Sequence, residues 1–142
     1  MITKLGIIGH PIGHTMSPVL HKAALDYYNL NSEFNTWDVK PGALCSFVKK
    51  ARNLQNGIIG FSVTVPHKEA ITPMLDGISN EALSAGAVNM VSNQDGQLFG
   101  YNTDGLGFLR SIFEKAEFNL KDKKVLILGA GGAAKACILS SL

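Results

Sequence analysis

Short apolar runs that stop at glycine or proline recur between residues 4 and 101 and predict buried strands. Residues 4–9 and 34–39 are the first two runs, and residues 57–65 form the third. In the third run Ile58 and Ile59 are expected to be buried, and polar and apolar side chains alternate after them. The core is therefore expected to form around a β-sheet.

Apolar residues at helical spacing lie between these runs. One helix is predicted to be capped by Ser17, with Pro18 in its first helical position. A second helix opens at Pro41, and its predicted apolar face consists of Leu44, Phe47, Val48, Ala51 and Leu54. Pro66 is expected to end the third strand and begin another helix. Two further helices are predicted at residues 81–85 and 106–116.

A β-hairpin is predicted where Asp95-Gly96 separates two apolar runs, residues 87–91 and 98–101. Before this hairpin, strands alternate with helices, and that order favours parallel pairing. The hairpin adds one antiparallel pair. We therefore predict an α/β fold, with a three-layer substrate domain built on a mixed sheet.

A glycine-rich turn follows the last apolar run of the chain, Val125–Leu128. The turn fits G-x-G-x-x-A between a strand and a helix, which is typical of a Rossmann dinucleotide site. Glycines permit the tight turn and let the backbone approach a pyrophosphate, while free N–H groups at the helix start face the phosphates. The predicted cofactor-binding residues are Gly129, Ala130, Gly131, Gly132 and Ala133. A tight turn without a ligand is the alternative.

The polar stretch at residues 119–124 is the best linker candidate. In a Rossmann fold the ribose-binding residue is expected about 20 residues beyond the glycines, but only ten residues follow Gly132. We therefore expect three parts: a substrate domain at residues 1–103, a connecting helix and linker at 104–123, and the beginning of a truncated Rossmann domain at 124–142. These 142 residues alone are expected to be catalytically inactive.

Composition and charge change this picture little. The chain has 13 Lys and Arg against 11 Asp and Glu, a formal charge of +2, which indicates neither a nucleic-acid nor a membrane partner. Cys45 and Cys137 lie far apart without CxxC spacing, so neither a disulfide framework nor a metal site is predicted. No stretch approaches the roughly 20 apolar residues of a membrane span, and a cytoplasmic protein is expected.

Polar side chains that could perform chemistry stand in or beside the predicted strands. Thr64 lies on the exposed face of the third strand, and Lys68 lies in the first turn of the helix that follows. Asn89 lies in a later strand, and Asp104 lies at a strand-to-helix junction. Each has a structural alternative: a solvated lysine, a helix cap, or an amide that pairs with buried backbone. His67 is expected to be a surface residue at the helix start.

Four segments of the chain, in their order and spacing, resemble the shikimate dehydrogenase family. They are Thr15-Met16-Ser17-Pro18, residues 62–68, Gly86-Ala87-Val88-Asn89 and residues 102–105, and the glycine motif at residues 129–133 follows them. The V-T-V-P-x-K, G-A-V-N and N-T-D-G blocks are jointly far more specific than the glycine motif. The resemblance covers essentially the whole chain.

The resemblance implies an oxidoreductase that reduces 3-dehydroshikimate to shikimate with NADPH, within aromatic amino-acid biosynthesis. By position, Lys68 and Asp104 would be the catalytic pair, with Lys68 passing a proton to the carbonyl oxygen. The residues implied to bind substrate are Thr15 and Ser17, at the carboxylate, and Thr64, Lys68, Asn89 and Asp104. The resemblance implies no metal, and it leaves a homodimer open.

Three positions depart from the family's usual pattern. Thr15 replaces the first serine of a Ser-x-Ser pair, as in some quinate-using relatives, and Ser62 replaces an asparagine. Asn80 stands where an acidic residue is often found, so no cofactor role is expected for it. Two alternatives therefore stay open: a quinate/shikimate dehydrogenase, and a non-catalytic protein that binds shikimate-like acids.

Overall fold

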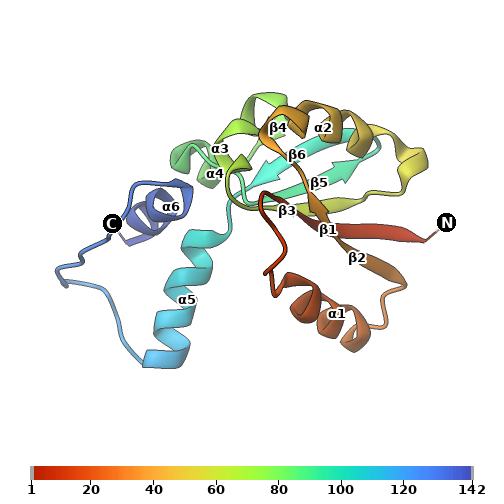
Figure 1. Ribbon diagram of the computed structural model, residues 1–142. Coiled ribbons are helices and arrows are strands. Elements are labelled where there is room, and N and C mark those ends of the chain that lie inside the picture. The colour runs from red at the N-terminus through yellow and green to blue at the C-terminus, as the bar shows by residue number, and fades with distance from the viewer. Residues whose placement is uncertain (1, 142) are drawn as a thin grey trace.

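The computed structural model describes residues 2–141 and folds them around one six-stranded mixed sheet (Figure 1). The strands are β1 (Thr3–Gly9), β2 (Ser32–Asp38), β3 (Gly60–Val63), β4 (Gly77–Ile78), β5 (Met90–Gln94) and β6 (Gln97–Tyr101). Their order across the sheet is β2-β1-β3-β5-β6-β4. Strand β5 is antiparallel to both of its neighbours, whereas the other pairings are parallel. The predicted α/β class and mixed sheet are confirmed.

Helices cover both faces of the sheet. They are α1 (Ser17–Tyr27), α2 (Leu44–Arg52), α3 (His67–Ala70), α4 (Asn80–Ala85), α5 (Asp104–Ala116) and α6 (Gly132–Ser141). Short 3-10 segments are η1 (Pro41–Ala43), η2 (Leu54–Asn56) and η3 (Thr72–Met74). Helix α1 lies on one face of the sheet, while α2, α3 and α4 lie on the other (Figure 1). Helices α5 and α6 stand beside the sheet and pack against each other.

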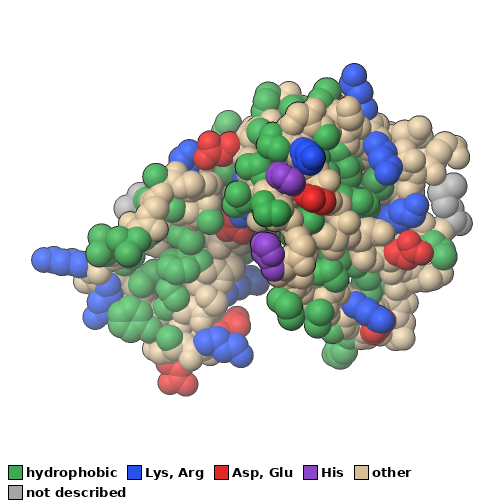
Figure 2. Space-filling view, in the orientation of Figure 1, with side chains coloured by type: hydrophobic (Ala, Val, Ile, Leu, Met, Phe, Trp, Pro, Cys, Tyr) green, Lys and Arg blue, Asp and Glu red, His purple; other side chains and the backbone are tan. Residues whose placement is uncertain are grey.

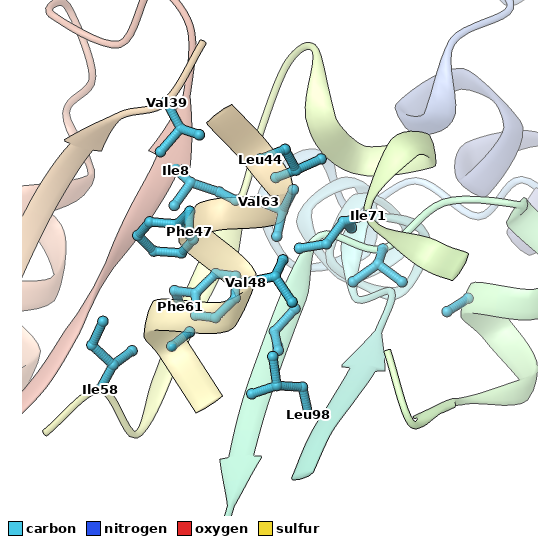
Figure 3. Packing of buried hydrophobic residues seen from close by; sticks show 14 residues of the cluster. Ile8, Val39, Leu44, Phe47, Val48, Ile58, Phe61, Val63, Ile71 and Leu98 are labelled. Atoms are coloured by element: carbon cyan, nitrogen blue, oxygen red, sulfur yellow. The ribbon is translucent and has the colours of Figure 1, made fainter. Parts of the chain in front are cut away.

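The main hydrophobic core lies between the sheet and α2 (Figure 3). Phe47 of α2 packs edge-to-face on Phe61 of β3, with 5.2 Å between the ring centres. Ile8 of β1 and Leu98 of β6 are fully buried in the same cluster. Of the predicted apolar face of α2, only Leu54 is exposed, because the helix ends at Arg52 and Leu54 belongs to η2.

The β5–β6 hairpin is confirmed, and its turn has the predicted chemistry, but its first strand runs from Met90 to Gln94 and not over residues 87–91. Asn93 pairs with Leu98 and Gln94 with Gln97, so Asp95-Gly96 form a two-residue loop. Both loop residues have positive φ, 54° at Asp95 and 88° at Gly96. This combination is typical of a type I′ turn, which asparagine, aspartate and glycine tolerate best.

Two predictions about single residues are wrong. Ser17 does not cap α1, because the helix already includes Ser17, and Met16 occupies the N-cap position without a side-chain hydrogen bond. Ile59 is exposed, whereas its neighbour Ile58 is buried. Successive residues of an extended chain point to opposite faces, so only one of two adjacent isoleucines can face the core.

The strand predicted at Val125–Leu128 is also wrong, since these residues form no regular secondary structure. A strand needs neighbouring N–H and C=O groups to pair with, and no other described residue between 2 and 141 pairs with this segment. The helix that should follow it is present as α6. No helix among the described residues has the length and apolar character that crossing a membrane requires.

Arg52 at the end of α2 binds the segment just before β4, the strand at one edge of the sheet. Its guanidinium donates to the Asp76 carboxylate and, at 2.8 Å, to the Met74 carbonyl. The same carboxylate accepts from the N–H of Leu98 at 2.7 Å. The hydrogen bond from Arg52, followed by that from Leu98, holds the pKa of Asp76 below its ordinary value of 3.8.

Asp76→Asn is expected to lower the free energy of unfolding near neutral pH and to have little effect in strong acid. A lowered carboxyl pKa contributes stability above its ordinary pKa, and that contribution disappears as the pH falls through the lowered value. Urea unfolding at a series of pH values measures the difference, with Asp26→Asn on the exposed side of α1 as control. A difference that persists unchanged into strong acid would contradict this account of Asp76.

Candidate active site

One edge of the sheet brings the predicted site residues together. Strands β1, β3 and β6 run in the same direction and end at this edge, and the antiparallel strand β5 begins there. The segments at this edge carry Thr15 and Ser17 after β1, Thr64 and Lys68 after β3, Asn89 before β5, and Asp104 after β6. The prediction that Thr64 and Asn89 lie within strands is wrong, because β3 ends at Val63 and β5 begins at Met90. Residues distant in sequence therefore meet because the strands that carry them are neighbours.

Lys68 and Asp104 form an ion pair at the centre of this edge. The Lys68 ammonium Nζ donates to Asp104 Oδ2 at 2.5 Å, and the two side chains are 17% and 24% exposed. The other carboxylate oxygen, Oδ1, accepts from Asn89 Nδ2 at 2.7 Å. Because the pair is mostly but not wholly covered, a small molecule can reach it. The charges are screened less there than at an open surface.

The amide of Asn89 is held in one orientation. Its Oδ1 accepts from the Thr103 backbone N–H at 3.0 Å, so the other end of the amide, Nδ2, must face Asp104. Nδ2 also donates to Thr103 Oγ1 at 3.0 Å. The main chain of Asn89 donates to Tyr101 at 3.0 Å and accepts from Val63 at 2.8 Å. Both strands beside it therefore fix its position.

Two neighbouring hydroxyls form a second part of the site. Thr15 Oγ1 donates to Ser17 Oγ at 3.0 Å and accepts from the Ser17 backbone N–H at 3.2 Å. Together with Thr64, they line a hollow of about 360 Å³. His10 lines the same hollow, and its Nδ1 lies 2.7 Å from Asp38 Oδ1. Figure 2 shows two histidine side chains near the middle of one face, one of them beside an acidic side chain.

The glycine-rich turn lies against the catalytic candidate Lys68. A larger hollow, about 910 Å³, is lined by Thr64 and Lys68 on one side and by Gly131, Gly132 and Ala133 on the other. The predicted residues Gly129 and Ala130 do not line it. Thr64 lines both hollows, so they adjoin there.

Backbone geometry explains why glycine is needed at two positions of this turn. Gly129 has a φ of 130°, a conformation that favours glycine. At Gly132 a Cβ would lie 2.8 Å from the Cβ of Ala87, so with any larger residue α6 could not begin as close to the segment before β5. A Cβ at Gly131 would meet no atom within 4 Å, which leaves that side of the turn open to a ligand.

The prediction that His67 is a surface residue is wrong. Its side chain is 1% exposed, and Nε2 lies 2.6 Å from the Val39 carbonyl. Because a carbonyl only accepts, Nε2 carries the hydrogen and donates it. His67 thus anchors α3, and with it the adjacent Lys68, to the chain that follows β2.

Cys137 of α6 is a free thiol near the ion pair. Burial raises the pKa of this thiol, the negative charge of Asp104 raises it further, and Lys68 partly opposes them. A thiol with a raised pKa stays protonated and is a poor nucleophile. Among residues 2–141, no three His, Cys, Asp or Glu side chains are grouped as a metal ion would require.

Sequence comparison identifies the family to which this site belongs. Residues 7–91, more than half of the chain, match the model of the shikimate dehydrogenase substrate binding domain. The chain belongs to the shikimate dehydrogenase family. Its matched segment contains β3, α3 with Lys68, and Asn89.

Individual members of the shikimate dehydrogenase family match this chain along nearly its whole length. The chain is 46% identical over 135 residues to the shikimate dehydrogenase (NADP(+)) of Bacillus mycoides strain KBAB4, covering 95% of this chain and 48% of that protein. It is 47% identical over 136 residues to that of Geobacter metallireducens, covering 96% and 47%. The chain therefore spans about half the length of these relatives.

Solved structures of shikimate dehydrogenases share this fold. The shikimate 5-dehydrogenase of Thermus thermophilus, crystallised in complex with NADP(H) and shikimate, matches with a TM-score of 0.91 and 37% identity. The match covers 99% of this chain and 52% of that one.

Proposed function

We propose that the protein containing this chain is an NADP-dependent shikimate dehydrogenase. It reversibly reduces 3-dehydroshikimate to shikimate in aromatic amino-acid biosynthesis, and this chain contributes the substrate-binding half. The observation that carries the proposal is the Lys68–Asp104 pair, 2.5 Å apart, which lies beside both the glycine turn and Asn89. The names of the relatives support the cofactor and the substrate.

Lys68 is the proton donor in this proposal. Reduction of a ketone adds a hydride to the carbonyl carbon and a proton to its oxygen, and the developing negative oxygen needs a positioned donor. Lys68 Nζ carries transferable protons, and Asp104 holds it in place from the side. In the oxidation direction the roles reverse, and Lys68 Nζ takes the proton from the substrate hydroxyl as a neutral amine and becomes an ammonium. Asp104 and Asn89 offer acceptors and donors to the remaining substrate hydroxyls.

Thr15 and Ser17 hold the substrate carboxylate in this proposal. Their hydroxyls lie 3.0 Å apart and line one hollow with Thr64. Hydroxyl groups can donate to a carboxylate without adding a charge of their own. Since Thr64 also lines the larger hollow, a substrate held at its carboxylate by Thr15 and Ser17 can extend towards Lys68.

The glycine turn suits the phosphates of a dinucleotide. Gly131 is open on the side where a Cβ would stand, and α6 begins at Gly132 with N–H groups that lack helical acceptors. The residues that would hold the cofactor are Gly129, Ala130, Gly131, Gly132 and Ala133. The last three of them line the larger hollow. When bound, NADP supplies or accepts the hydride.

The domain boundaries that we propose follow the same division. The substrate domain comprises residues 1–103, and α5 begins at the next residue, Asp104. Residues 104–123 connect it to the beginning of the cofactor domain at 124–142. Under this division, Lys68 and Asn89 belong to the substrate domain, and Asp104 stands at its border.

A quinate/shikimate dehydrogenase is the second candidate, and Thr15 is the observation that favours it. Its hydroxyl donates to Ser17, and Thr15 lines the same hollow with one methyl group more than the serine usual in the family. The reaction and the roles of Lys68 and Asp104 would be unchanged. Only the substituents accepted beside the carboxylate would differ.

Steady-state assays of the natural protein that contains this chain test the proposal. We expect it to reduce NADP+ with shikimate, and to have a lower kcat/KM with quinate. A higher kcat/KM with quinate would favour the second candidate. If calorimetric titration detects shikimate binding but neither acid reduces NADP+ or NAD+, the protein is a non-catalytic binder and the proposal is wrong.

A further inference from the structure

We propose that Asn102 is a positioning residue, whose buried side-chain amide sets the distance between Asp104 and the segment that carries Asn89. This inference rests on the proposed function, since it concerns the geometry of the same ion pair. Asn102 follows the last residue of β6, and it is 8% exposed. It touches neither hollow that contains the candidate substrate residues.

Both ends of the Asn102 amide bind main-chain groups. Its Oδ1 accepts from the backbone N–H of Asp104 at 3.0 Å, and its Nδ2 donates to the carbonyl of Ala87 at 2.9 Å. The Asp104 N–H lies in the first turn of α5, where N–H groups have no helical acceptor. Asn102 therefore satisfies a helix terminus and joins it to the residues just before Asn89.

The Ala87–Asn89 segment is also joined to the other half of the ion pair. The backbone N–H of Val88 donates to the carbonyl of Lys68 at 2.8 Å. This segment is thus joined to α3 by a main-chain hydrogen bond and to the start of α5 through the side chain of Asn102. Through Asn102 on one side and Val88 on the other, it fixes Lys68 and Asp104 relative to each other.

The side chain of Asn89 also binds Thr103 and Asp104, and its main-chain N–H binds Tyr101. Asn102 differs from these contacts because its side chain joins a main-chain group of the Ala87–Asn89 segment to the first N–H of α5. Substitution of Asn102 by Ala leaves the buried Ala87 carbonyl and the partly buried Asp104 N–H without their partner. The start of α5 can then move relative to α3, and a displacement of about 1 Å can lower the rate about 100-fold.

Asn93 provides a matched control at the opposite end of β5. Its Nδ2 donates to the carbonyls of Ala51, at 2.6 Å, and Ile58, at 2.8 Å, and its Oδ1 accepts from the N–H of Gly96 at 2.8 Å. Like Asn102, it joins separate segments through main-chain groups. Asn93→Ala is therefore expected to lower the free energy of unfolding without changing the ion pair.

The test compares Asn102→Ala, Asn102→Ser and Asn93→Ala in the natural protein. We expect Asn102→Ala to lower kcat for shikimate about 10- to 100-fold, with the KM for NADP+ unchanged. Asn102→Ser can still accept from Asp104 but is too short to reach Ala87, so its kcat should be intermediate. If Asn102→Ala does not fold, Asn102→Ser replaces it as the test variant. Asn93→Ala should lose stability and keep its kcat.

A spectroscopic measurement separates this inference from the proposed function. The side-chain amide resonances of Asn89 should shift in Asn102→Ala and Asn102→Ser but not in Asn93→Ala. If the natural protein does not oxidise shikimate, the proposed function fails, and these resonances still decide the positioning role. Folded Asn102 variants with unchanged kcat or unchanged Asn89 resonances would overturn it, as would an equal fall of kcat in Asn93→Ala.

Discussion

Lys68→Ala is expected to lower kcat for shikimate oxidation about 100- to 10,000-fold and to change the KM for shikimate much less. The variant removes the amine that donates to Asp104 at 2.5 Å and that we propose exchanges a proton with the substrate oxygen. Thr15, Ser17 and Thr64 remain to bind the substrate. An interaction needed mainly in the transition state lowers kcat when it is lost, and ground-state binding survives.

Steady-state kinetics of the natural protein measure this effect, with Lys50→Ala as the matched control. Lys50 is an exposed lysine of α2, so its removal should leave kcat unchanged. The double variant Lys68→Ala/Asp104→Ala should lose much less than the product of the two single losses, because the pair acts as a unit. Turnover that survives in Lys68→Ala would assign the proton transfer to another group.

Gly105→Ala is expected to lower the free energy of unfolding by about 1–3 kcal/mol, as overpacking typically does, and to lower kcat as well. A Cβ at Gly105 would lie 2.6 Å from the carbonyl oxygen of Ala136 and 1.9 Å from Ser140 Oγ. The serine hydroxyl can rotate away, but the backbone carbonyl of α6 cannot. Helix α5 must then move from α6, and Asp104 at the start of α5 moves with it.

Gly107→Ala is the matched control for this prediction. It lies one turn or less from Gly105 in the same helix, but a Cβ there would meet no atom within 4 Å. Alanine is favoured over glycine inside a helix, so this variant should gain about 0.5–1 kcal/mol. Urea unfolding of both variants measures the difference. Equal stability of the two would show that the α5–α6 packing described here is absent in solution.

Local sequence patterns were sufficient for features that depend on near neighbours. The Asp95-Gly96 turn was predictable because a type I′ turn needs two positive φ values, which those two residue types tolerate. Alternating strands and helices indicated the α/β class, since each crossover returns the chain to a parallel neighbour. The residues of the V-T-V-P-x-K, G-A-V-N and N-T-D-G blocks were assigned from a resemblance, and the sheet edge then brought them together.

Features that depend on partners distant in sequence were missed. His67 is buried because it reaches the Val39 carbonyl, 28 residues earlier, and nothing beside it in the chain indicates that contact. Val125–Leu128 is apolar enough for a strand but has no neighbour to pair with among the described residues. Asn102 joins two segments 15 residues apart, which its own helix-start motif does not reveal.

Sequence alone thus established most of the element types, the hairpin and the glycine-rich turn, because these follow from local propensity and spacing. The polar groups at the strand ends were identified only through the resemblance to a family. The tertiary structure decided which of those groups meet. Lys68, Asn89 and Asp104 come together because β3, β5 and β6 are adjacent and β5 runs in the opposite direction. Burial and hydrogen bonding depend on such through-space neighbours, and these are set only when the sheet has formed.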